Sequence, residues 1–215
     1  MTEVGPPVRR GAGRPTREQA EARHAELLDT ALDLFLEHGY EQATVEAIAA
    51  RVNMTKRTIY ALYPDKASLF LAAVRRAIDR QAVPRAVLDG LDSGDLTATL
   101  AAIARLRIDQ VMTSDGLRLQ RIINTESYRF PEIFVTSYEV STGPVVDFVV
   151  EMLERAAAAG EIAPVDCDQA ARAFLSMAVG GQVRAIVAGR PPTRRQLEQR
   201  VRFAVRLLLD GLRPR

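Results

Sequence analysis

The chain has 215 residues, of which 47% are hydrophobic and 26% are charged, and its formal net charge is +2. These values are typical of a globular protein and exclude a strongly basic or acidic polypeptide. The single cysteine, Cys167, excludes an intramolecular disulfide framework. We see neither an uninterrupted apolar run long enough to span a bilayer nor a signal-peptide core, so we expect a cytoplasmic protein without a membrane partner.

The N-terminal region predicts a basic arm followed by a long amphipathic helix. Residues 1–14 are rich in Gly, Pro and Arg, and we expect a flexible arm that is either an idle tail or a minor-groove contact, with Arg14 the candidate DNA contact. Thr16 and Gln19 have the spacing of a capping box at the start of the helix. Gly39 is expected to end it.

Residues 44–66 predict two short helices around a tight turn, followed by the start of a third helix. Thr44 and Thr55 are placed to cap the two short helices with their hydroxyl groups. Asn53 is placed to adopt the left-handed conformation where the first of them ends. Ile59 and Leu62 are predicted to face the core.

The outer face of the second short helix gathers residues suited to DNA. Short donors, cations and a phenol lie close together there: Thr55, Lys56, Arg57, Thr58 and Tyr60. One exposed helix of this kind brings such groups to base edges and phosphates in the major groove. Arg57 is the first candidate for reading a base, because a guanidinium can hold O6 and N7 of guanine together. The alternative is that Lys56 and Arg57 form only a solvated face.

Three motifs together resemble the DNA-binding domain of the TetR family of transcriptional regulators: GRPT at 13–16, ALDLFLEHGYEQATVEAIA at 31–49 and MTKRTIYALYPDKASLF at 54–70. The resemblance implies phosphate contacts for Thr44, Tyr60 and Lys66. It also implies that Tyr63 lies near the DNA backbone or in the domain core, and that residues 55–58 face the groove. The turn position that the family usually fills with Gly is Asn53 here.

In the remaining chain apolar residues recur with the spacing of a helix, which predicts an all-α fold. We expect an arm at 1–14, a three-helix helix-turn-helix domain at 15–82 with its recognition helix at about 55–62, and a larger helical ligand-binding and dimerisation domain at 83–215. Gly143 and Pro144 are expected to interrupt one helical stretch, and Pro84 to break another. Residues 119–160 resemble the C-terminal domain of the AefR-like branch of the same family.

A ligand pocket is expected among the helices of residues 96–188, lined by apolar side chains and a few polar groups. Taken singly, each candidate is better explained as a core residue. The candidates are Ile103, Ile122, Glu126, Phe134, Tyr138, Phe148, Met152, Phe174 and Met177.

The last two predicted helices carry continuous apolar faces that need cover. The interior of the chain takes part of this surface, and the family resemblance implies that the remainder forms a homodimer interface. The residues assigned to it are Phe174, Ala178, Gly181, Leu197, Val201, Ala204, Val205 and Leu208. Two-fold symmetry also suits DNA, because paired recognition helices enter successive major grooves.

Catalysis finds no support in the sequence, which contains no phosphate-binding loop and no metal-ligand spacing, so we expect no enzyme, no cofactor and no metal. The family resemblance implies a repressor that binds a palindromic double-stranded operator as a dimer and is released by a small apolar or amphipathic effector. Two alternatives remain open, a constitutive DNA-binding regulator without small-molecule input and a helical small-molecule carrier.

Overall fold

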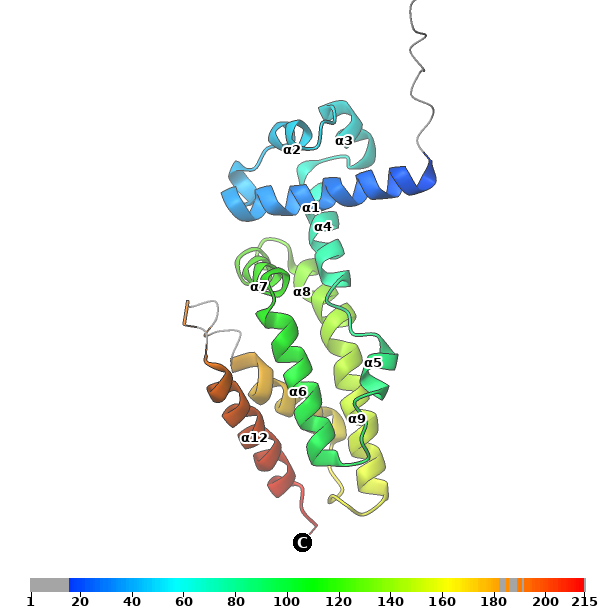
Figure 1. The fold of residues 1–215 in the computed structure, drawn as a ribbon, viewed down its shortest axis with the longest axis vertical. Coiled ribbons are helices and arrows are strands. Elements are labelled where there is room, and N and C mark those ends of the chain that lie inside the picture. The colour runs from blue at the N-terminus through cyan, green and yellow to red at the C-terminus, as the bar shows by residue number, and fades with distance from the viewer. Residues whose placement is uncertain (1–15, 182–184, 186–188, 191, 215) are drawn as a thin grey trace, which may run out of the picture. The chain divides into compact units, whose positions relative to one another are not determined.

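The computed structural model describes residues 16–181, 185, 189–190 and 192–214 (Figure 1). Every regular element in these ranges is a helix, in agreement with the all-α prediction. The chain divides into two compact units, Met1–Ala73 and Val74–Arg215, and the division falls inside helix α4, Lys66–Asp79. We describe each unit by itself.

The first unit contains α1 (Arg17–Gln42), α2 (Val45–Arg51), α3 (Lys56–Leu62) and the beginning of α4. The capping box predicted for α1 is present, with Thr16 and Gln19 bonded reciprocally. At Gly39 the backbone leaves helical geometry with φ 78°, and a short helical extension follows it. The predicted end of α1 is therefore a kink at glycine, where positive φ carries no Cβ penalty.

An aromatic cluster forms the centre of this unit. The ring of Phe70 meets those of Phe35 and Tyr40 edge-on, with centroids 4.9 and 5.1 Å away. Ile48 is fully buried from α2, and Ile59 is 1% exposed from α3. This core fixes α2 and α3 against α1 by burial of apolar surface.

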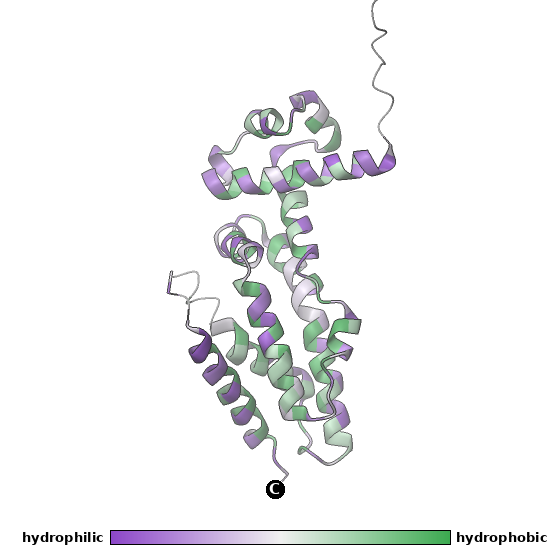
Figure 2. Cartoon of the chain, viewed as in Figure 1, coloured by the Kyte–Doolittle hydropathy of each residue, from purple (hydrophilic) through white to green (hydrophobic). Residues whose placement is uncertain are grey.

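The second unit holds α5 (Arg85–Asp89), α6 (Leu96–Met112), α7 (Ser114–Glu126), α8 (Pro131–Ser137), η1 (Tyr138–Thr142), α9 (Gly143–Ala158), α10 (Cys167–Leu175), η2 (Ser176–Gly180) and α12 (Arg194–Gly211). Its core is formed mainly by α6, α9, α10 and α12. Helix α12 begins with a second capping box, between Thr193 and Gln196. Figure 2 shows polar and apolar residues on different sides of this helix.

The predicted interruption at Gly143 and Pro144 is wrong, because the helical run continues from α8 through α9. The five residues of η1 form a π-helix, and Pro144 follows at the beginning of α9. A proline lacks the N–H that an α-helix would bond, and the wider π turn accommodates this gap without ending the helix.

The continuous helix Pro131–Ala158 is long and apolar enough to pass a length-and-composition test for crossing a membrane, which the sequence did not lead us to expect. Length and composition alone are weak evidence for a membrane span, and 33% of the apolar window is buried inside the protein. In α9 the side chains of Val145, Phe148, Val149 and Leu153 are buried in the second unit.

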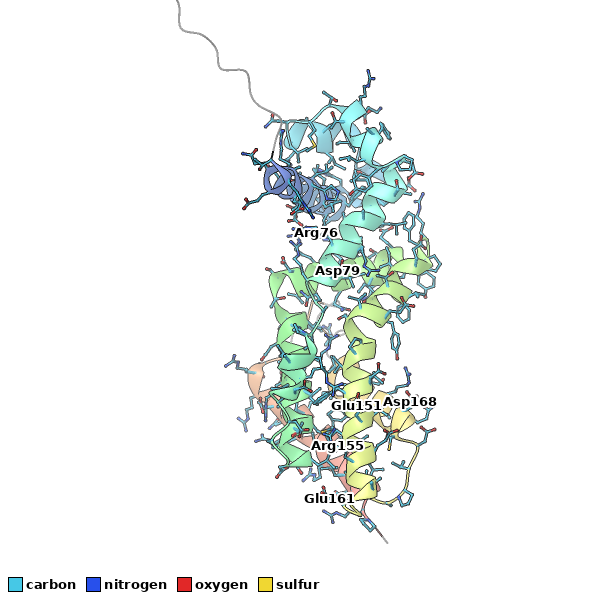
Figure 3. All side chains as sticks on the ribbon, turned by 90° about the vertical axis from the view of Figure 1, so that its right-hand side faces the viewer. Arg76, Asp79, Glu151, Arg155, Glu161 and Asp168 are labelled. Carbon is cyan, nitrogen blue, oxygen red and sulfur yellow. The ribbon has the colours of Figure 1, made fainter. Side chains whose placement is uncertain are left out.

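Exposed ion pairs join α9 to the segments beside it. Arg85 bonds both carboxylate oxygens of Glu151, at 2.9 and 2.7 Å, and Arg155 reaches Asp92 at 2.5 Å. Figure 3 shows Glu151 and Arg155 close together along α9. Pairs as exposed as these contribute little to stability, so burial of the apolar face holds the helix in place.

Candidate nucleic-acid interface

The two short helices begin and end as the sequence predicts. The hydroxyl of Thr44 accepts the N–H of Ala47 at 3.2 Å, and that of Thr55 accepts the N–H of Thr58 at 3.1 Å. Caps of this kind stabilise a helix by about 1 kcal/mol each. Asn53 has φ 53°, and it is the one non-glycine residue with positive φ in the ranges that the structure describes.

The inner side of α3 is anchored by Ile59 alone. Leu62, which we predicted to face the core, is 52% exposed. It lies in the last turn of a seven-residue helix. From Tyr63 the chain continues extended, with φ −133° and ψ 114°, so no further turn of α3 covers this leucine.

The outer side of α3 is polar and open to solvent. It presents Thr55, Lys56, Arg57, Thr58 and Tyr60. The hydroxyls of Thr55 and Thr58 lie 2.8 Å apart, and the ammonium of Lys56 lies 5.6 Å from the ring centre of Tyr60. These five residues, which we call the α3 face, thus form one continuous surface of donors, cations and a phenol.

The two cations of the α3 face differ in their partners. Lys56 forms an ion pair with Glu46, a residue of the first turn of α2. Hydrogen bonding within this pair lowers the pKa of Glu46 and raises the pKa of Lys56. Arg57 has no hydrogen bond or ion pair to any residue that the structure describes. Its guanidinium is therefore free to meet a ligand.

Glu46 is the functional neighbour that sequence reasoning missed. It precedes Lys56 by ten residues and belongs to another helix, so no spacing within one helix links the two. The only available signal was its place beside the Thr44 cap. A carboxylate here puts negative charge within the surface expected to meet phosphates.

Tyr63 and Lys66 are tied into the protein. The hydroxyl of Tyr63 lies 2.5 Å from Nε2 of His24, the two rings stack, and burial raises the pKa of Tyr63. Nζ of Lys66 donates to the carbonyls of Tyr40, Glu41 and Ala43 at 2.8, 3.1 and 3.2 Å. An ammonium has three N–H groups, so a phosphate contact by Lys66 would replace one of these bonds. Arg14, the predicted contact of the N-terminal arm, lies outside the described residues.

Most predicted ligand-binding residues lie in the hydrophobic core. Buried side chains include Ile103, Ile122, Phe148, Met152 and Phe174. Glu126, Tyr138 and Met177 are half-buried. The remaining residue, Phe134, is 60% exposed, which contradicts its assignment to an internal pocket. The inward position of α8 belongs to Ile133, and the next residue points about 100° further round the helix.

The burial of α10, η2 and α12 also corrects the predicted dimer surface. Six of the eight assigned residues, Phe174, Ala178, Val201, Ala204, Val205 and Leu208, are at most 8% exposed within one chain. They face α6 and α9 in the chain's own core, so they offer a partner almost no surface. Leu197 and Gly181 keep some exposure, and Arg200 lies against Gly181.

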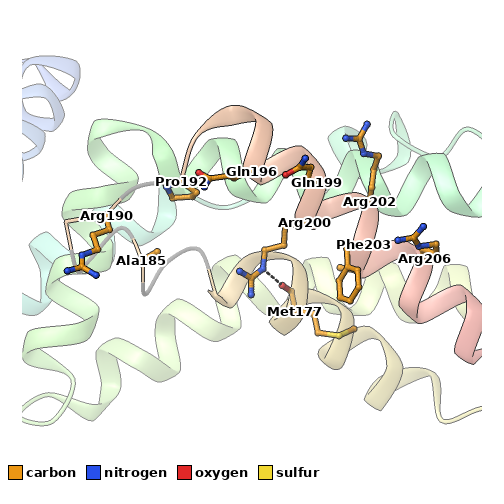
Figure 4. Close-up of a pocket in the computed structure, with 11 residues that line it drawn as sticks. Met177, Ala185, Arg190, Pro192, Gln196, Gln199, Arg200, Arg202, Phe203 and Arg206 are labelled. Carbon is orange, nitrogen blue, oxygen red and sulfur yellow. Dashed lines mark hydrogen bonds between the residues drawn. The ribbon is translucent and has the colours of Figure 1, made fainter.

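The opposite side of α12 is the exposed one. Phe203 and Leu207 are 56% and 49% exposed there. A hollow of about 1280 Å³ lies along this side, and Figure 4 shows Phe203 in it between Arg200 and Arg206. Of the residues predicted to bind ligand, Met177 is the one that lines this hollow. Sequence periodicity missed Phe203 and Leu207 because α12 carries apolar residues on both sides.

A capped, cation-bearing helix that follows a tight turn and leaves its polar side open is the geometry of a helix-turn-helix DNA-binding protein. Comparison with known families agrees. Residues 27–73 match the family described as bacterial regulatory proteins, tetR family, and residues 98–211 match the AefR-like transcriptional repressor, C-terminal domain. The chain belongs to the TetR family, and it is a transcriptional regulator, not an enzyme.

Individual relatives agree with this membership. The HTH-type transcriptional repressor Rv1474c of Mycobacterium tuberculosis is 29% identical over 171 residues, which are 68% of this chain and 88% of that protein. The HTH-type transcriptional regulator Rv1556 of the same organism is 45% identical over 74 residues. That match covers 34% of this chain and only 37% of the relative.

Solved structures share the whole fold. The flavonoid-responsive regulator FrrA is 28% identical, with a TM-score of 0.70 over 90% of this chain and 99% of that one. A TetR-family regulator from Mesorhizobium loti superposes with a TM-score of 0.74 over 93% of this chain and 100% of that one, at 20% identity. The latter likeness supports the fold alone.

Proposed function

We propose that this regulator acts in the cytoplasm as a homodimeric repressor, which binds a near-palindromic operator through two copies of the α3 face and leaves it when a small molecule binds. The observation that carries this proposal is the exposed α3 face with an unpaired Arg57 at its centre. A surface guanidinium without an internal partner loses no protein bond when it meets a base or a phosphate.

The residues of the α3 face divide into two proposed roles. Arg57 and Thr58 meet base edges in the major groove, where a guanidinium holds guanine O6 and N7. Thr44 and Tyr60 meet phosphates on either side and fix the position of the helix. Lys56 also reaches DNA once it leaves Glu46.

The dimer is proposed to form through the exposed side of α12. Phe203 and Leu207 are large apolar side chains open to solvent, and the hollow beside them gives a partner's side chains a place to enter. An isologous contact along α12 supplies the two-fold symmetry that a palindromic site requires. It replaces the set of interface residues that we assigned from the apolar faces and the family resemblance.

The effector is proposed to be a small amphipathic molecule that binds within the second unit. FrrA, whose name records a response to flavonoids, shares the fold at 28% identity, so planar aromatic compounds are the first class to screen. Release from DNA requires that the effector bind the DNA-incompetent conformation more tightly than the DNA-bound one.

The test is to sequence the genomic fragments that the purified protein retains, and then to measure gel shifts on the recovered site. We expect a symmetric sequence with half-sites about 10 base pairs apart, centre to centre. Retention equal to that of random duplex would refute the proposal. If the site is bound but no compound in a broad screen weakens binding, the constitutive regulator is the correct alternative.

A further inference from the structure

Arg107 is a cation in the interior of the second unit whose hydrogen-bond partners are all neutral. It extends from the later turns of α6, where it is half-buried. Its guanidinium donates to Oε1 of Gln110 at 2.7 Å and to the hydroxyl of Ser141 at 3.2 Å. Desolvation by the surrounding protein lowers the pKa of Arg107.

No carboxylate among the described residues forms an ion pair with Arg107. By contrast, Arg85 and Arg105 each reach a glutamate on another helix with two N–H groups. A partly desolvated guanidinium whose partners are all neutral can still form stronger, charge-assisted hydrogen bonds with an anion.

The geometry leaves Arg107 able to accept such an anion. A guanidinium has five N–H donors, and the structure occupies two of them. Part of the side chain remains open to solvent. The planar pair of donors matches the two oxygens of a carboxylate.

Ser141 connects this cation to the end of α4. It lies in the π-helix η1, is 5% exposed and donates its hydroxyl to the carbonyl of Gln81 at 3.4 Å. Gln81 follows the last residue of α4 by two positions. π-Helical turns are frequent at functional sites. Arg107, Ser141 and Gln81 therefore form a hydrogen-bonded chain from the interior of the second unit to the helix that enters it.

We propose that Arg107 binds the carboxylate of the effector, so that this regulator responds to small organic acids in preference to their neutral analogues. The inference rests on the proposed release by a ligand and adds the chemical class of that ligand. A carboxylate on Arg107 competes with Ser141 for the guanidinium. Ser141 then changes its bond to Gln81, and the end of α4 responds to occupancy of the site.

The test is thermal denaturation of the full chain without DNA, in the presence of matched acid and amide pairs: benzoate and benzamide, phenylacetate and phenylacetamide, octanoate and octanamide. We expect at least one acid to raise Tm, and its amide to leave Tm unchanged. Arg107→Met should weaken binding of that acid roughly 10- to 100-fold, the usual effect of losing bonds to a charged group. The ligand-free Arg107→Met protein should melt at the same or a higher temperature than the parent.

Three further variants keep the result interpretable. Arg121→Met removes an exposed cation from the same unit and should respond to the acid as the parent does. Arg107→Lys keeps the charge without the planar fork and should give an intermediate affinity. Ser141→Ala should keep acid binding but weaken the effect of the acid on DNA binding.

The proposal is overturned if no acid exceeds its amide, if Arg107→Met still responds, or if that variant lowers the Tm of the ligand-free protein. The last result would make Arg107 a structural donor. Because melting involves no DNA, these outcomes are separate from the fate of the DNA-binding proposal. A protein that binds the acid but no operator would refute only the latter.

Discussion

Helices α3 and α12 both carry a surface to which we assign a proposed function, but the sequence predicted only the one on α3. In α3 one buried apolar residue, Ile59, sets the orientation of the helix, and the polar residues from Thr55 to Thr58 are exposed to solvent. In α12 the buried Val201 and the exposed Phe203 are two residues apart and both apolar. The sequence therefore predicts which side of a short helix is a polar surface. It does not predict which side is exposed when a helix carries apolar residues on two sides.

The largest effect should come from the exposed side of α12. Replacing Phe203 and Leu207 together by Glu places two carboxylates in the proposed isologous contact, where they face their own copies. We expect a monomer by sedimentation and at least about 100-fold weaker operator binding, since one half-site must then hold the protein alone. Tyr128→Glu is the matched control, because this tyrosine is 97% exposed on another part of the chain. A double variant that stays dimeric would show that the contact lies elsewhere.

Arg57→Ala should have the next largest effect. Loss of a bidentate base contact is expected to weaken binding by about 1–3 kcal/mol and to relax the preference at one base pair. Binding to a panel of operator variants measures both quantities. Arg51→Ala, which removes another exposed cation from the first unit, should lower affinity without changing the preferred sequence. An equal loss for Arg57→Ala at all variants would make Arg57 a phosphate contact.

Glu46→Gln should strengthen DNA binding. The change removes a negative charge beside the α3 face and releases Lys56 from its ion pair. We expect tighter binding to random duplex and a salt dependence steeper by about one phosphate contact. Fluorescence anisotropy over a range of salt concentrations measures this. Asp168→Asn removes a carboxylate that is paired with Arg172 in the second unit and serves as control. Equal affinities for the Glu46 variant and the parent would contradict the proposed competition for Lys56.

The smallest effect concerns the beginning of α4. Oδ1 of Asp65 accepts the N–H of Ser68 at 2.7 Å, and these hydrogen bonds lower the pKa of Asp65. A carboxyl group with a lowered folded-state pKa stabilises the fold above its unfolded pKa, and this contribution disappears as pH falls through the folded pKa. Asp65→Ala should lower the free energy of unfolding near neutral pH, and should lower it less in acid. Asp65→Asn, which retains a capping oxygen, should cost less. Denaturant unfolding at several pH values measures the stability of both variants. A loss of stability that is independent of pH would show that the charge of Asp65 does not contribute.

The sequence predicted local structure well because caps and turns depend on residues near one another. Thr16, Thr44 and Thr55 cap their helices as expected, and Asn53 takes its left-handed conformation. What it missed depends on pairs far apart in the chain. Glu46 reaches Lys56 from another helix, and Ser141 joins Arg107 to Gln81 across 34 and 60 residues. Helical period identifies which residues share a face, but not which neighbour that face meets.

The ammonium of Lys66 has a mechanical consequence. By holding three carbonyls at the end of α1, it joins the first turn of α4 to the far end of the longest helix in the first unit. Sliding α4 along α1 would break several charge-assisted bonds at once. A displacement that enters through α4 should therefore turn the DNA-binding unit as a rigid body and leave the shape of its reading surface unchanged. In the proposed dimer, an effector would then change the distance between two DNA-binding units without changing either unit internally.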